Sequence, residues 1–117
     1  MSDDKQDLKN FLRLAKESIS SKQYKKALQY CKKALSIDKK NYHALFFAGF
    51  CSAKLNLVQQ AEQAYNKAIE IDPNNAQAWL GLVEIYTTTT EIPEKEKAAR
   101  DQKLFKAYYA LSELYKK

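Results

Sequence analysis

Residues 27–41 read ALQYCKKALSIDKKN, and residues 61–75, 34 positions later, read AEQAYNKAIEIDPNN. Small alanines and the polar residues at the end of the segment recur between the two copies. The repeated pairs are Ala27/Ala61, Lys33/Lys67, Ala34/Ala68, Ile37/Ile71, Asp38/Asp72 and Asn41/Asn75, with Ala44/Ala78 just beyond them. A fixed period of this length predicts stacked helical hairpins, because one hairpin cannot bury its apolar face alone. The expected product is a binding surface rather than a catalytic centre.

Apolar residues spaced three and four apart predict six helices in an all-α chain. We expect them at about 5–20, 24–37, 42–55 and 58–71, then from about 76 to 86 and from about 94 onward. Thr87–Thr90 are poor helix formers and Pro93 breaks the pattern, so residues 87–93 are expected to form an enlarged turn. Residues 1–117 then make one domain, with repeats at about 8–41, 42–75 and 76–117.

The composition excludes several classes of function. One His and two Cys are too few for a metal site, and no nucleophile and base can be assembled. We therefore expect no enzyme, cofactor, metal or small-molecule substrate. Cys31 is expected to be a buried thiol, and Gly49 and Gly81 to be close-packing positions inside helices. No membrane span or secretory signal is evident, which favours the cytoplasm, and also the nucleus, as the location.

This pattern resembles the tetratricopeptide repeat family. Small residues stand where paired helices cross closely, as Ala27 and Ala34 and again as Ala61 and Ala68, and Pro73 marks a repeat end. The resemblance implies an α-α superhelix of about six helices in three hairpins, the third of them irregular. It also implies that the first helix of each hairpin lines a concave surface for protein partners.

A narrower resemblance, to the scaffold family of the superkiller complex, spans nearly the whole chain. It rests on LAKE at 14–17, YKKALQYCK at 24–32, KNYHA at 40–44, AWLGLVEIY at 78–86 and LSELY at 111–115. The resemblance implies a scaffold that organises an RNA helicase and WD-repeat subunits and feeds messenger RNA to the exosome for 3′-to-5′ decay. Members are much longer arrays, so this chain would match only their N-terminal arm. The alternatives are a stand-alone adaptor or co-chaperone-like module that binds a peptide, and a basic RNA-binding module.

By register, ten residues would line the concave surface. They are Lys9, Leu12, Lys16, His43, Phe46, Phe50, Lys54, Gln77, Leu80 and Glu84. Four of them, Leu12, Phe46, Phe50 and Leu80, form an apolar stripe, which is typical of a partner site. The stripe would hold an amphipathic helix or an extended segment. Alternatively, the last helix curls over it and buries it with Leu104, Phe105, Tyr108 and Tyr109.

Chaperone-binding members of the family hold a C-terminal Glu-Glu-Val-Asp tail with a clamp of Lys, Asn and Arg. The matching positions here carry Leu12, Lys16, Phe47, Gln77 and Gly81. Only Lys16 would serve in such a clamp. The resemblance therefore argues against binding of that tail.

Positive charge is concentrated in the first half of the chain. Residues 1–60 hold 12 Lys/Arg and 5 Asp/Glu, whereas residues 61–117 hold 8 and 9. The second expected helix and the turn before it carry Lys22, Lys25, Lys26, Lys32 and Lys33. This patch would contact RNA or an acidic partner, or else it is a solvated convex face. Aromatic residues are not expected to interleave with these lysines as a stacking platform would need, which favours the solvated face.

Overall fold

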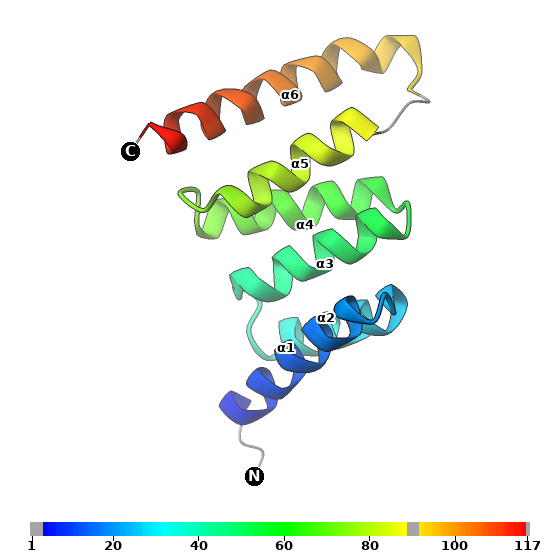
Figure 1. Cartoon of the computed structure of the whole chain (residues 1–117), viewed down its shortest axis with the longest axis vertical. Helices are drawn as coiled ribbons and strands as arrows, with labels where there is room; N and C mark the ends of the chain where they lie inside the picture. Colours follow the sequence, from blue (N-terminus) through cyan, green and yellow to red (C-terminus); the bar gives the residue numbers. More distant parts are fainter. Residues whose placement is uncertain (1–3, 89–91, 117) are drawn as a thin grey trace.

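A computed structural model describes residues 4–88 and 92–116, which form six helices and no strand. The helices are α1 (Asp4–Ser20), α2 (Tyr24–Ile37), α3 (Tyr42–Lys54), α4 (Val58–Ile71), α5 (Ala76–Thr88) and α6 (Glu94–Tyr115). Consecutive helices pack as antiparallel neighbours in one elongated stack, with α1 and α2 at one end and α6 at the other (Figure 1). None of these helices is long and apolar enough to cross a membrane.

The turns inside the first two hairpins have the same construction, and they too are 34 residues apart. Lys22 and Asn56 occupy the left-handed region with φ of 61° and 63°. In both turns the next residue donates its amide to the carbonyl of a buried serine, Ser18 or Ser52, over 2.8 Å. The period of the sequence is therefore also a period of backbone conformation.

Asparagine side chains begin the first helix of the second and third hairpins. Asn41 Oδ1 accepts from the amide of Ala44 over 3.0 Å, and Asn75 Oδ1 accepts from the amide of Gln77 over 3.0 Å. These bonds satisfy amides that a helix N-terminus leaves without an intrahelical partner. The repeated asparagine thus fixes where each following helix begins.

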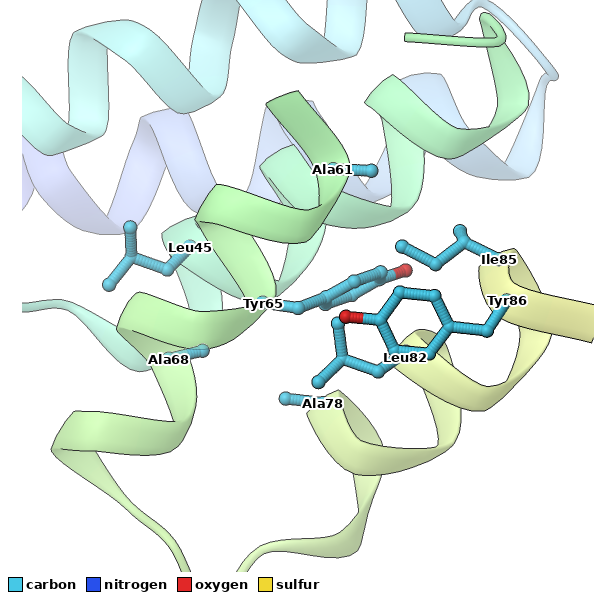
Figure 2. Close-up of a cluster of buried hydrophobic side chains, with 8 residues drawn as sticks. All are labelled: Leu45, Ala61, Tyr65, Ala68, Ala78, Leu82, Ile85 and Tyr86. Atoms are coloured by element: carbon cyan, nitrogen blue, oxygen red, sulfur yellow. The ribbon is translucent and has the colours of Figure 1, made fainter. Parts of the chain in front are cut away.

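The largest core cluster surrounds Tyr65 on α4, between α3 and α5 (Figure 2). Its members are Leu45, Ala61, Tyr65, Ala68, Ala78, Leu82, Ile85 and Tyr86. A Cβ built on Gly49 or Gly81 would lie 2.7 or 2.4 Å from the Tyr65 ring, so a glycine of α3 and one of α5 let the ring lie between the helices. The predicted close-packing role of these glycines is therefore confirmed. The four alanines predicted at the helix crossings, Ala27, Ala34, Ala61 and Ala68, are each 0% exposed, which confirms their predicted role.

The third hairpin departs from the first two, and part of the expected turn is wrong. α5 continues through Thr88, and the hydroxyls of Thr87 and Thr88 donate to the carbonyls of Val83 and Glu84 over 2.8 and 2.7 Å. Residues 89–91 lie outside the described part of the chain. α6 then packs along α5 and reaches α4 only through side chains.

Candidate functional site

A row of four side chains, His43, Phe46, Phe50 and Lys54, follows one side of α3. The ring of Phe46 stacks on Tyr42 with centroids 6.4 Å apart, and it lies 6.5 Å from Phe50. It also lies 5.9 Å from the buried ring of Tyr65. Phe46 is therefore anchored in the core while part of its ring stays open to solvent.

The other end of this row connects α3 to its neighbours. Phe50 meets Tyr24 of α2 edge-on with centroids 6.2 Å apart. Lys54 Nζ lies 5.3 Å from the centre of the Phe50 ring and 4.0 Å from Glu84 Oε1 on α5. Because both partners of that ion pair are largely exposed, it adds little stability, but it orients charged groups beside the ring.

The structure brings all ten predicted surface residues onto three adjacent helices, since α3 contacts both α1 and α5. We call these ten residues the first-helix face. Leu12, Phe46 and Phe50 are half-buried, and Leu80 is 46% exposed. The six polar members, Lys9, Lys16, His43, Lys54, Gln77 and Glu84, are exposed.

The alternative in which the last helix covers this face is wrong. α6 packs on α5 and does not touch α1 or α3 within the described residues. Leu104 packs against the Tyr65 cluster, whereas Phe105, Tyr108 and Tyr109 are 72%, 50% and 61% exposed. α6 lies at the end of the stack away from α1 (Figure 1), and the exposure of these three rings shows that they do not form a cover over the face.

Two residues matched to the chaperone clamp are not part of the first-helix face. Gly81 is buried against the Tyr65 ring, and Phe47 packs on the cluster of Ala15, Cys31 and Ala48. Neither position can present a clamp side chain to a peptide on that face.

A cleft that the sequence did not predict lies between α4, α5 and α6. One cavity of about 530 Å³ and a second of about 410 Å³ share Glu62, Tyr86 and Lys103 in their walls. The apolar side chains in the walls of the cleft include Ile69, Trp79, Ile85 and Ile92. The sequence signal for this cleft was that the last helix begins later than the 34-residue period would place it. In the structure, α6 packs less closely on α5 than α2 packs on α1 or α4 packs on α3.

A polar network bridges this cleft. The Tyr86 hydroxyl donates to Glu62 Oε2, and Lys103 Nζ donates to the same oxygen over 3.1 Å. Arg100 Nη1 donates to the carbonyl of Tyr86 over 2.9 Å near the end of α5. Burial, and then the hydrogen bond to Glu62, raise the pKa of Tyr86 above its ordinary value. The hydroxyl therefore stays protonated and links α5 to α4.

The residues that could carry metal or thiol chemistry are not arranged for it. In the described ranges, no three His, Cys, Asp or Glu side chains gather as metal ligands. Cys31 and Cys51 are free thiols with 0% exposure, so the buried thiol predicted at Cys31 is confirmed. A side-chain hydrogen bond with Cys51, together with burial, raises the pKa of Cys31. Cys31 therefore remains a neutral thiol.

The expectation that aromatic residues do not interleave with the lysines is wrong. Lys22, Lys25, Lys26, Lys32 and Lys33 are all exposed, as predicted. The rings of Phe11 on α1 and Tyr30 on α2 stack with centroids 6.5 Å apart, however, and Lys33 Nζ lies over both. The sequence hides this contact, because Phe11 lies on the other helix of the hairpin.

Comparisons with known proteins agree with this geometry. Tetratricopeptide repeat models match residues 18–79 and 64–97. Superkiller complex protein 3 of Homo sapiens is 39% identical over 77% of this chain and 6% of its own length. Tetratricopeptide repeat protein 37 of Xenopus laevis is 36% identical over 94% of this chain and 7% of its own length. The chain therefore spans only a small part of these relatives.

A solved structure, the Arabidopsis OM64 TPR domain, superposes with a TM-score of 0.74. The superposition covers 90% of this chain and 80% of that domain, at 22% sequence identity. At this identity the likeness concerns the fold alone. The fold and the matching models are those of a protein-interaction module rather than of a catalytic family.

Proposed function

Because this chain belongs to the tetratricopeptide repeat family, we propose that it is the partner-binding arm of a superkiller-type scaffold. In this role it contributes to a cytoplasmic or nuclear assembly that includes an RNA helicase, WD-repeat subunits and the exosome. That assembly would carry out 3′-to-5′ decay of messenger RNA. The identity to two relatives over most of this chain supports the proposal.

The observation that carries the binding role is the open aromatic row on the first-helix face. Phe46 is held by Tyr42 and Tyr65, so the row is rigid before a partner arrives. Rigid aromatic anchors bind at low entropic cost. The neighbouring Leu80, 46% exposed, gives the partner an apolar contact on the next hairpin.

The charges of the first-helix face indicate which segment fits it. Lys9, Lys16 and Lys54 are basic, whereas Glu84 is the acidic member and is already paired with Lys54. An acidic segment with one or two apolar anchors complements this pattern. We propose that such a segment of a scaffold subunit lies along α1, α3 and α5.

Capture of the superkiller helicase, WD-repeat and exosome subunits by the tagged chain tests this function. Leu80→Asp places a charge at the exposed apolar contact and should weaken capture at least tenfold without unfolding the chain. Leu57→Asp is the matched control, because Leu57 is 38% exposed on another surface and precedes α4 at its N-cap position. Aspartate is favoured at that position, so the control should keep both its stability and its partners.

Equal capture by the Leu80→Asp and Leu57→Asp chains would refute the first-helix face as the binding site. Capture of none of the superkiller or exosome subunits by the unaltered chain would favour the stand-alone adaptor. Whether the reading frame continues beyond Lys117 bears on the same question, since an arm requires a longer array.

A further inference from the structure

We propose that the outer side of the first hairpin binds single-stranded nucleic acid through the stacked rings of Phe11 and Tyr30 and the lysines beside them. This site is separate from the first-helix face. It lies on α1 and α2, at the end of the stack opposite α6 (Figure 1). We define the platform as Phe11, Tyr30, Lys26 and Lys33.

The two rings form a firm stacking surface. Their planes are inclined by 25° with centroids 6.5 Å apart, and both residues are half-buried. Tyr30 packs against the buried cluster of Ala15, Cys31 and Ala48, so the platform is supported from below. A base that stacks here therefore need not order the rings first, and stacking on aromatic rings favours any unpaired base.

The Lys33 ammonium lies over both rings, which shows that this side of the rings is open to a cation–π or stacking partner. Its Nζ lies 5.7 Å from the Phe11 centroid and 5.9 Å from the Tyr30 centroid. A flexible, exposed lysine yields this position easily. When a base takes its place, the ammonium can move to the phosphate of the same nucleotide.

The basic residues follow the rings along the helix. Lys26, Tyr30 and Lys33 are spaced four and three residues apart on α2, which places them on one side of this helix. At 1.5 Å per residue, Lys26 and Lys33 lie roughly 10 Å apart along the axis, on either side of Tyr30. Two neighbouring phosphates can therefore be neutralised while the base between them stacks.

A shallow hollow continues the platform toward the α1–α2 turn. It has a volume of about 180 Å³, and Leu14, Ser18, Lys26 and Tyr30 are among its lining residues. Glu17 is the acidic group in its wall, and its carboxylate is paired with Arg13 over 3.1 Å. Residues 4–37 contain nine basic side chains and only three acidic ones, Asp4, Asp7 and Glu17.

Unpaired strands suit this surface better than a duplex does. Stacking on a protein ring requires a base that is free of its neighbours, as in single-stranded RNA or DNA. An acidic peptide would satisfy the lysines but would leave the paired rings without a stacking partner. The rings therefore favour nucleic acid over an acidic protein segment.

Fluorescence anisotropy of the whole chain with a fluorescein-labelled 12-nucleotide oligouridylate tests this site. We expect micromolar affinity in low salt, weakening as salt rises with a logarithmic slope of roughly −1.4 for two phosphate contacts. Lys26→Gln with Lys33→Gln should weaken binding at least tenfold and remove most of that slope. Lys95→Gln with Lys97→Gln on α6 is the matched control, because it removes the same charge far from the platform.

The stacking contribution is tested separately. Tyr30→Leu and Phe11→Leu keep apolar bulk but remove the ring, so each should weaken binding at least fivefold while the salt slope stays unchanged. Circular dichroism melts of both variants check that the hairpin still folds. Leu80→Asp should leave oligouridylate binding unaltered, which separates this site from the proposed partner face.

Three results would overturn the proposal. The first is an equal loss of affinity in the α2 and α6 lysine variants, which would show unspecific charge attraction. The second is full affinity in both folded leucine variants. The third is equal competition by a polyglutamate peptide of matched charge, which would make the surface an acidic-peptide site.

Discussion

The ring of Tyr65 leaves room only for glycine at two positions on the neighbouring helices. This ring lies against Gly49 of α3 and Gly81 of α5. The tyrosine itself belongs to α4 (Figure 2). An added Cβ at position 81 would lie 2.4 Å from Tyr65 Cζ. This atom belongs to a buried ring held on both sides, so it cannot move aside cheaply.

We therefore expect Gly81→Ala to destabilise the fold, although alanine normally favours a helix by about 1 kcal/mol over glycine. Overpacking of this kind costs about 1–3 kcal/mol. Urea denaturation followed by circular dichroism measures the change. A variant as stable as the parent, or more stable, would show that the Tyr65 ring relaxes freely.

Three tyrosines make the free energy of unfolding depend on pH in the alkaline range. Burial raises the pKa of Tyr42, Tyr65 and Tyr86 above the ordinary value of 10.0, and Glu62 adds to the effect at Tyr86. In the folded state these hydroxyls hold their protons at a pH where the unfolded chain has lost them. Their contribution is therefore complete below about pH 10 and is lost as the pH rises above it.

Stability should consequently fall between pH 9.5 and about pH 11.5, more steeply in the parent than in Tyr86→Phe. Urea midpoints at each pH for both chains give the comparison. Because the two chains differ only in this hydroxyl, the difference between their curves isolates Tyr86. Parallel curves would contradict the assigned environment of this hydroxyl.

At the scale of the helices, the asparagine caps explain why the predicted starts of α3 and α5 agree with the structure. Asn41 and Asn75 occur at the same place in the repeat, and both accept from amides in the first turn. Such caps are readable from sequence, because asparagine is strongly favoured at this position.

Asn41→Ala should lower the free energy of unfolding by about 1 kcal/mol, since the amide of Ala44 loses its acceptor. Asn41→Asp retains a side-chain acceptor and should cost much less. Thermal melts of the two variants test the cap directly. An equal loss in both would point to a different role for Asn41.

Other features of the helices could not be predicted from the sequence. Lys22 takes a left-handed conformation that favours glycine or asparagine, and only its partner in the repeat, Asn56, has a residue type suited to it. Thr87 and Thr88 stay helical against their propensity, and their hydroxyls donate to carbonyls one turn back.

At the scale of the whole molecule, the order of the six helices could be predicted from the 34-residue period. Only some of the surfaces could be predicted in the same way. The ten residues of the first-helix face lie on adjacent helices as their register implies. The cleft beside Glu62 and the Phe11–Tyr30 pair depend on how α6 and α1 pack against their neighbours. Periodicity specifies which residues face inward, but it does not specify the angle at which an irregular hairpin closes.

The stack should not be equally stable along its length. A repeat contacts only its neighbours, so stability is distributed through successive interfaces. The backbone of α6 packs on α5 alone and its side chains reach α4, whereas α3 contacts four other helices. Leu111→Ala, which removes a buried side chain of α6, should speed hydrogen exchange in α6 and leave α3 and α4 protected. Uniform loss of protection would instead indicate one cooperative unit.

The packing of the α6 backbone on α5 alone also has a mechanical consequence. If the chain is pulled from its two ends, both ends bear the same tension, and α6 is the terminal helix with fewer neighbours. Arg100 and Lys103 are the polar side chains that join it to α5 and α4. The helices should then unfold in sequence, beginning with α6 and continuing one hairpin at a time. The first hairpin, at the other end, should give way independently of that sequence.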